Sequence, residues 1–204
     1  MKSKVITKYR KNVPLTWEQV KAALNESRDN PEVIQEQVKI GLVLMVIYGL
    51  RASELLSLCL DNISLENETL ILTNSKQQQI TIPLASDTVV LFNRLIKLAG
   101  KSEYLFPDLK GKGTSLSSHT FIHATQKLLP PFNLSGLRLF FAQFLFERDI
   151  SLEITSTLLN KKYPYYRQFN FDYLKERHEI YCTLSSLVLP EAFSKEQLIK
   201  MEAA

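Results

Sequence analysis

Apolar side chains recur along most of the chain at the spacing of amphipathic helices. In the first such segment, Thr16 and Gln19 have the spacing of a capping box, which predicts a helix through Leu24. A longer helix is expected to begin with Pro31 in its first turn and to end at Gly49. Its apolar positions become nearly continuous, so we expect it to be the central buried helix.

Two short β-branched runs interrupt the helical pattern. Residues 69–73 and 80–84 flank a polar tip at 74–79, which predicts one small antiparallel hairpin. Further helices are expected at 53–58, 87–99, 117–128, 135–146, 152–159, 172–184 and 194–201. No internal repeat or linker is visible, so the pattern predicts one mainly α domain with a small antiparallel β-sheet.

Composition narrows the class of protein. The chain has 204 residues, of which 45% are hydrophobic, and this content is ample for a packed core and excludes a disordered chain. The apolar run at 40–50 is too short to span a bilayer, and residues 1–12 lack the apolar core of a signal peptide, so we expect a cytoplasmic protein without a membrane partner. Cys59 and Cys182 lie in apolar helical patterns without metal-ligand spacing, which favours buried thiols.

Positive charge is concentrated in one place. The formal net charge is +4, but residues 1–12 carry five basic residues and no acid. Residues 109–146 also contain no Asp or Glu. The segment 109–146 either forms a face that binds a polyanion or consists of a buried helix with a loop in front of it. Charge alone leaves both interpretations open.

Two arginines are notable because each follows a Gly-Leu pair. Arg51 lies at the break after the buried helix, and Arg138 lies in a helix so apolar that an unpaired charge there would be costly. In one interpretation they form structural ion pairs, Arg51 with Glu54 and Arg138 with Glu147. In the other, their two planar forks converge on one phosphate, for which Arg is better suited than Lys.

These segments resemble the catalytic domain of the tyrosine recombinases, or phage integrases. The resemblance covers most of the chain. It is carried by the opening segment 14–20, the arginine box 49–55, the hairpin ending at 80–84, the Tyr-Leu-Phe-Pro segment at 104–107 and the ungapped stretch 138–161. The resemblance implies the recombinase catalytic-domain fold, with no metal or cofactor and with double-stranded DNA as the partner.

The resemblance also implies a set of catalytic roles. Arg51 and Arg138 take the positions of the two arginines that bind the scissile phosphate, and Lys76, at the hairpin tip, takes that of the acid that protonates the leaving 5′ oxygen. A tyrosine hydroxyl then forms a 3′-phosphotyrosyl link. Ser135 stands where the family has the first assisting histidine, and Lys161 stands where it has the second.

The nucleophile is displaced from its usual spacing, which falls on Asn170. Tyr173, at the start of a predicted helix, is the preferred candidate, followed by Tyr166 and then Tyr181. His119 and His123 have a spacing that can hold a metal, but no third ligand is apparent, so we expect DNA contacts there instead. The other expected DNA contacts are basic residues of the arm and of one turn: Lys8, Arg10, Lys11, Lys110 and Lys112.

The expected organisation is a basic arm at 1–12, the integrase-like domain at 13–189 and a C-terminal helix at 190–204 that begins at Pro190. The arm stands in the place of the additional N-terminal domain that integrases usually carry. The last helix is expected to dock either on a neighbouring copy or full-length recombinase, or on its own chain. Three functions remain open: a divergent recombinase, a DNA-binding or partner-binding regulator that has lost catalysis, and a protein-interaction module without a DNA role.

Overall fold

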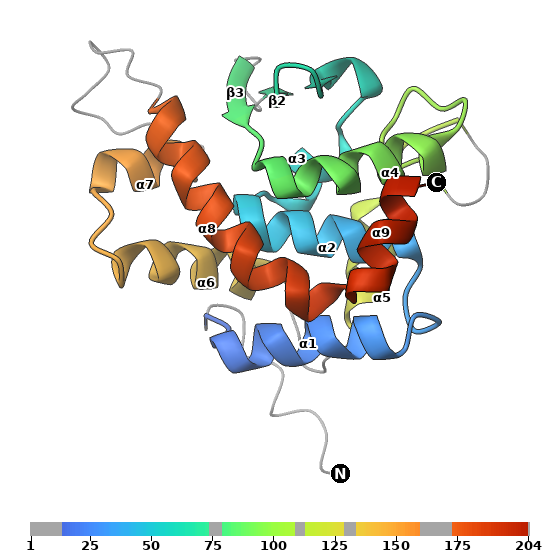
Figure 1. Ribbon diagram of the computed structural model, residues 1–204, viewed down its shortest axis with the longest axis horizontal. Helices are drawn as coiled ribbons and strands as arrows, with labels where there is room; N and C mark the ends of the chain where they lie inside the picture. The colour runs from blue at the N-terminus through green and yellow to red at the C-terminus, as the bar shows by residue number, and fades with distance from the viewer. Residues whose placement is uncertain (1–13, 74–78, 109–112, 129–133, 160–172, 204) are drawn as a thin grey trace.

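The computed structural model describes residues 14–73, 79–108, 113–128, 134–159 and 173–203. The fold is mainly α with one small antiparallel sheet, as predicted (Figure 1). The helices are α1 (Trp17–Asp29), α2 (Glu36–Tyr48), α3 (Ala52–Leu56), α4 (Val89–Ala99), α5 (Ser118–Thr125), α6 (Leu134–Phe146), α7 (Leu152–Leu158), α8 (Leu174–Ala192) and α9 (Lys195–Ala203). Single 3-10 turns are found at Leu60–Asn62 and Ser86–Thr88.

Helix α2 lies at the centre of the molecule (Figure 1). Every residue of α2 except Glu36 is buried, and the helix packs against α3, α4, α5, α6 and α8. Gly41 allows this close packing, because a Cβ there would lie 2.9 Å from the ring of Phe121 on α5. The helix ends at Gly49, in the left-handed conformation, which confirms the predicted end. It begins at Glu36 rather than at Pro31, which lies in a turn outside it.

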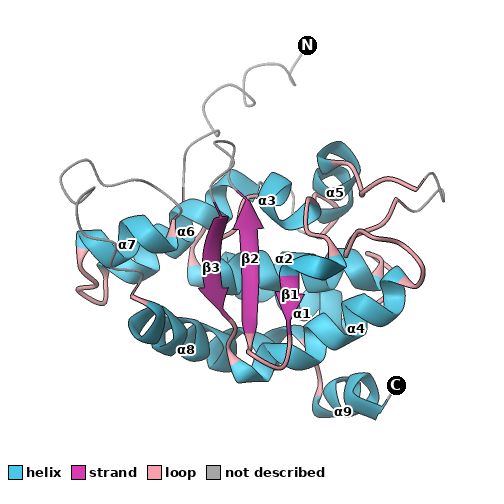
Figure 2. Cartoon of the chain, turned by 90° about the horizontal axis from the view of Figure 1, so that it is seen from above, coloured by secondary structure: helices cyan, strands magenta, loops and turns pink. Residues whose placement is uncertain are grey.

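The hairpin is present and carries one additional short strand. Strands β1 (Ile63–Ser64), β2 (Thr69–Thr73) and β3 (Gln79–Pro83) form a sheet in that order, and Figure 2 shows them side by side. Leu70 pairs with Ile82, and both side chains are buried because alternate residues of the hairpin face the core. The two-residue strand β1 was not predicted.

Helix α1 places the opening segment against the arginine-bearing helix α6. The capping box between Thr16 and Gln19 is formed, as predicted, although the helix continues beyond Leu24 to Asp29. The ring of Trp17 stacks on that of Phe140 in α6, with centroids 6.1 Å apart. This contact joins the start of α1 to α6, which packs mainly against α2.

The C-terminal break falls later than predicted. Pro190 lies inside α8, and the chain turns at Phe193 and Ser194 before α9. A proline so near the end of a helix leaves few helical hydrogen bonds beyond it to disrupt. Helix α9 packs against α4 of its own chain. Among the described helices, none combines the length and the apolar character that crossing a membrane requires.

Candidate functional site

The two arginines line one pocket. Arg51, Ser135 and Arg138 all contribute to a cavity of about 480 Å³ between the C-terminal end of α2, the start of α3, and helices α5 and α6. Arg51 and Arg138 are far apart in the sequence, and the packing of α6 on α2 brings them together. Both arginines therefore line one cavity, while their joint binding of one phosphate stays a prediction.

Arg51 is held at the mouth of this pocket by Glu54. It is the N-cap residue of α3, and its backbone N–H donates to Glu54 Oε2 at 2.8 Å. Its guanidinium also donates to Glu54 Oε1 at 2.6 Å. Because 48% of the Arg51 side chain is still exposed, the guanidinium remains accessible to a ligand.

Arg138 is held more deeply, with only 16% of its side chain exposed. Its Nη1 donates to the carbonyl of Gly49 at 2.8 Å, and its Nη2 donates to the carbonyl of Leu159. Nη1 also lies 3.6 Å from Glu54 Oε2. An ion pair with Glu147, one of the sequence-based alternatives, is wrong, because Glu147 accepts a hydrogen bond from Gln143 and Glu54 is the carboxylate beside Arg138.

One carboxylate therefore serves two guanidinium groups. Burial lowers the pKa of Arg138, and the nearby charge of Arg51 lowers it further, while Glu54 acts in the opposite direction. Two guanidinium groups and one carboxylate leave this cluster with a net positive charge, which favours a further anion. The pocket is thus electrostatically suited to a phosphate.

Gly49 connects the end of α2 to the arginine site. Its φ of 62° favours glycine, and a Cβ at this position would lie 2.6 Å from the ring of Phe141. Its carbonyl accepts from Arg138, so the glycine fixes the direction of the second guanidinium. Neither this carbonyl nor that of Leu159 was expected, because a main-chain acceptor leaves no signature in a sequence.

Helix α5 forms the adjoining wall. Its Ser118 and Ile122 line the pocket, and His119 and His123 follow them by one position each. The two histidine rings are exposed and nearly parallel, with centroids 6.5 Å apart. No cluster of three or more possible metal-ligating side chains occurs in the described part of the chain.

Two of the candidate nucleophiles, Tyr173 and Tyr181, lie in different surroundings. Tyr173 is the half-buried N-cap residue of α8, in the left-handed conformation with φ of 49°, and it is not among the residues lining the pocket. Tyr181 is fully buried, and its ring packs on Tyr48 with centroids 4.6 Å apart. Burial raises the pKa of the Tyr181 phenol, and both properties count against it as the nucleophile.

The remaining predicted site residues lie outside the described residues. These are Lys8, Arg10, Lys11, Lys76, Lys110, Lys112, Lys161 and the alternative nucleophile Tyr166. Cys59 and Cys182, expected to be buried thiols, are both free and only half-buried.

Comparison with known families identifies the class. Residues 14–162 match the model of the phage integrase family. Because this match covers more than half of the chain, the protein belongs to the phage integrase family. No curated protein matches the chain.

Solved structures share the fold at low sequence identity. XerA recombinase gives a TM-score of 0.60 at 15% identity, covering 82% of this chain and 64% of that one. The integrase from mycobacterium phage Brujita gives 0.62 at 14% identity, covering 95% and 65%. A lambda integrase tetramer bound to a Holliday junction gives 0.55 at 22% identity, covering 78% and 48%. The chain thus spans between about half and two-thirds of the length of these structures.

Proposed function

We propose that the protein binds double-stranded DNA and breaks and rejoins its strands through a 3′-phosphotyrosyl intermediate. The observation that carries the proposal is the single pocket lined by Arg51, Ser135 and Arg138, in which two guanidinium groups share one carboxylate. Membership of the phage integrase family supports the same reaction class.

The chemistry assigns a role to each group. The two arginines neutralise the non-bridging oxygens of the phosphate as charge develops, and the Ser135 hydroxyl donates a further hydrogen bond. The phenol oxygen of Tyr173 attacks the phosphorus and loses its proton to solvent, and the bond from phosphorus to the 5′ oxygen breaks. Lys76 gives a proton to that leaving oxygen, and Lys161 donates to the phosphate. Reversal of these steps rejoins the strand.

Binding to DNA is proposed to depend mainly on phosphate contacts. The histidines of α5 lie beside the pocket, and the basic residues Lys8, Arg10, Lys11, Lys110 and Lys112 are proposed to add further phosphate contacts. Contacts of this kind release counterions, so the affinity falls steeply as salt rises. The cytoplasmic location expected from the sequence remains a prediction.

A specific observation favours a second candidate, a DNA-binding regulator without strand cleavage. Two main-chain carbonyls already accept hydrogen bonds from Arg138, which leaves less of its fork for a phosphate. Ser135 is exposed, but a serine hydroxyl does not act as a base near neutral pH in the way that an imidazole does. On this alternative the fold and the arginine pocket bind DNA without cleaving it.

A nicked duplex that traps the cleaved strand tests the proposal. We expect a covalent protein–DNA adduct that Tyr173→Phe abolishes, whereas Tyr104→Phe, as the matched control, leaves it intact. If Tyr166→Phe abolishes the adduct instead, the proposed reaction stands, but the nucleophile is Tyr166 rather than Tyr173. Binding that salt weakens, without any adduct, supports the regulator. If the protein does not bind duplex DNA at low salt, both the recombinase and the DNA-binding regulator are contradicted. The remaining function is then a protein-interaction module without a DNA role.

Association through the C-terminal helix is a further part of the proposal. Helix α9 packs on α4 of its own chain, yet Ile199 on α9 is 62% exposed, which leaves an apolar side chain for a second copy or a full-length recombinase. Light scattering with and without DNA tests this. Ile199→Glu is expected to reduce association, and Lys195→Glu on the same helix serves as its control.

A further inference from the structure

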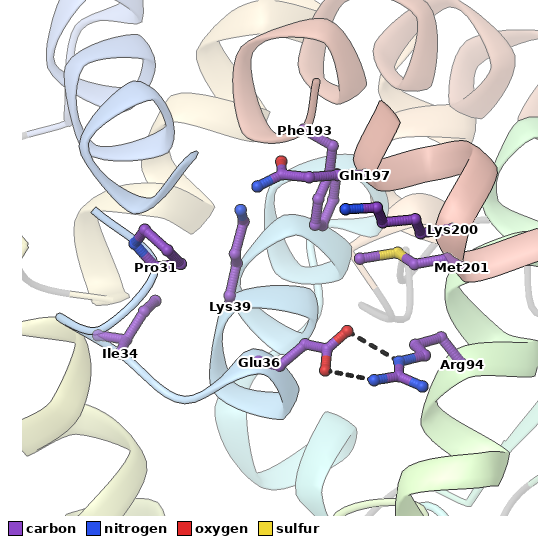
Figure 3. Close-up of a pocket in the computed structure, with 9 residues that line it drawn as sticks. All are labelled: Pro31, Ile34, Glu36, Lys39, Arg94, Phe193, Gln197, Lys200 and Met201. Atoms are coloured by element: carbon purple, nitrogen blue, oxygen red, sulfur yellow. Dashed lines mark hydrogen bonds and ion pairs between the residues drawn. The ribbon is translucent and has the colours of Figure 1, made fainter. Parts of the chain in front are cut away.

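A second pocket, of about 370 Å³, lies at the other end of α2. The turn before α2, the first half of α2, helix α4 and the segment from Phe193 into α9 form its walls. Figure 3 shows Lys39 extending from α2 into this space, with Pro31 and Ile34 on one side and Lys200 and Met201 on the other. Its volume is in the range of small-molecule sites.

Lys39 is the unusual group in this pocket. The residue is only 5% exposed, and in the described part of the chain its ammonium has neither a hydrogen bond nor a carboxylate within ion-pair distance. Its contact is the ring of Phe193, whose centroid lies 4.4 Å from Nζ. Burying an ammonium without an anion is costly, and burial lowers the pKa of Lys39 to about 8.

The neighbouring carboxylate is already engaged. Glu36 accepts two parallel hydrogen bonds from Arg94 on α4, each 2.8 Å long (Figure 3). This bidentate geometry is the strong form of an arginine–carboxylate pair, so Glu36 stays with Arg94. The pocket is therefore left with the positive charge of Lys39 inside and that of Lys200 at its exposed rim.

The remaining walls fit a ligand with a polar head and an apolar body. Gln197 uses its Oε1 to accept from the backbone of Ser194, while its amide nitrogen has no partner among the residues described. Ile34, Phe193 and Met201 supply buried apolar surface. An anionic head would meet Lys39 and the Gln197 amide, and an apolar tail would lie on this surface.

We propose that this pocket binds a small organic carboxylate, with its carboxylate group on Lys39 and Gln197 and its apolar body against Ile34, Phe193 and Met201. The site is separate from the arginine pocket and does not depend on the proposed strand cleavage. Because its walls come from α2, α4 and α9 together, a bound carboxylate holds α9 against the body of the molecule.

Titration of the full chain with hexanoate, followed by calorimetry and by protein NMR, tests the proposal. We expect hexanoate to bind at millimolar concentrations or below, with shifts centred on Ile34, Phe193 and Met201. Acetate should bind more weakly, because it lacks the apolar body, and hexanamide should bind at least about tenfold more weakly, because it lacks the charge. Equal binding of hexanamide and hexanoate, or no binding of hexanoate, would overturn the proposal.

Variants test where the carboxylate lies. Lys39→Met keeps most of the side-chain volume and is expected to weaken hexanoate binding by about tenfold or more, whereas Lys195→Met, on α9 outside the pocket, should leave it unchanged. Hexanoate should also slow proteolytic cleavage within α9 of the wild-type chain. An unchanged affinity in Lys39→Met, with the variant shown to be folded by circular dichroism, contradicts the assignment.

Discussion

A pocket lies at each end of α2, and the two pockets differ in how their carboxylates pair with the basic side chains. At the C-terminal end, Glu54 is divided between Arg51 and Arg138, and main-chain carbonyls complete the partners of Arg138. At the N-terminal end, Glu36 is committed to Arg94, and Lys39 is left with an aromatic ring. A surplus of positive charge results in both places. In each pocket, the cation that one carboxylate does not fully neutralise is the one that can bind an added anion.

The largest effect is expected from removing the deep arginine. Arg138→Gln removes the positive charge and part of the fork beside Arg51, so strand cleavage should fall by about 10²–10³-fold in a gel assay with nicked DNA. The control is Arg94→Gln at the other pocket, which breaks a bidentate pair with Glu36 but should leave cleavage unchanged. An equal loss in both variants would show that the first pocket has no special role.

The second-largest effect is expected on stability, from substituting Gly49 at the C-terminal end of α2. Gly49→Ala forces an alanine into a positive φ and brings its Cβ against Phe141, so urea denaturation should show a loss of about 2–4 kcal/mol in the free energy of unfolding. Gly113→Ala is the control, because Gly113 also has a positive φ but nothing within 4 Å of the added Cβ. It should cost only about 1 kcal/mol. Similar losses at both glycines would contradict the close contact.

Neutralising Glu54 and Glu36 in turn tests whether the two pockets have different roles. Glu54→Gln leaves two guanidinium groups without their shared anion, so we expect cleavage to fall by about tenfold while duplex binding at low salt is retained. Glu36→Gln releases Arg94 into the second pocket and should leave duplex binding and cleavage as they are. Fluorescence anisotropy and the adduct assay measure the two quantities. A cleavage defect in Glu36→Gln, but not in Glu54→Gln, would reverse the assignment.

The smallest effect concerns the titration of Lys39. Its pKa of about 8 is below the usual value of 10.5, so the unfolded chain binds more protons at this group than the folded chain between these two values. The penalty for burying the charge is present below pH 8 and is relieved as the pH rises through 8 toward 10.5. Wild type should therefore gain stability relative to Lys39→Met between pH 7 and pH 9.5.

Urea denaturation of both proteins at the two pH values checks this difference, because other titrating groups contribute equally to each. The charged groups near Lys39 come from several elements and are Arg28, Asp29, Glu36, Arg94 and Lys200. A difference between the two proteins that stays constant with pH would show that Lys39 does not titrate in this range.

Much of the fold followed from local pattern. The capping box at Thr16, the end of α2 at Gly49 and the hairpin pairing were predictable because each depends on neighbouring residues. The two prolines do not mark the helix boundaries that were predicted from them, for a physical reason. A fixed φ suits the first turn of a helix and also an ordinary turn, so Pro31 marked the wrong start of α2. Pro190 was tolerated near the end of α8.

The candidate site was predictable only in part. The residues around Arg51 and Arg138 left open whether the two form structural ion pairs or bind one phosphate together, and the fold places both in one pocket. The partners of Arg138 were not predictable, since the carbonyls of Gly49 and Leu159 reach it through tertiary packing. Lys39 stood in an apolar run, but its neighbours in sequence gave no indication of the pocket it enters.

The sequence by itself determined the helices, the hairpin and the two arginine segments, because propensity, capping and hydrophobic spacing act over a few residues. The pair of Arg51 with Glu54 is local and could be anticipated from the sequence, whereas the tertiary structure alone decided that Glu54 also lies beside Arg138 and that Glu36 pairs with Arg94. Ion pairs depend on distances of a few ångströms between side chains from different helices. Those distances are set only when α2 is packed among its neighbours.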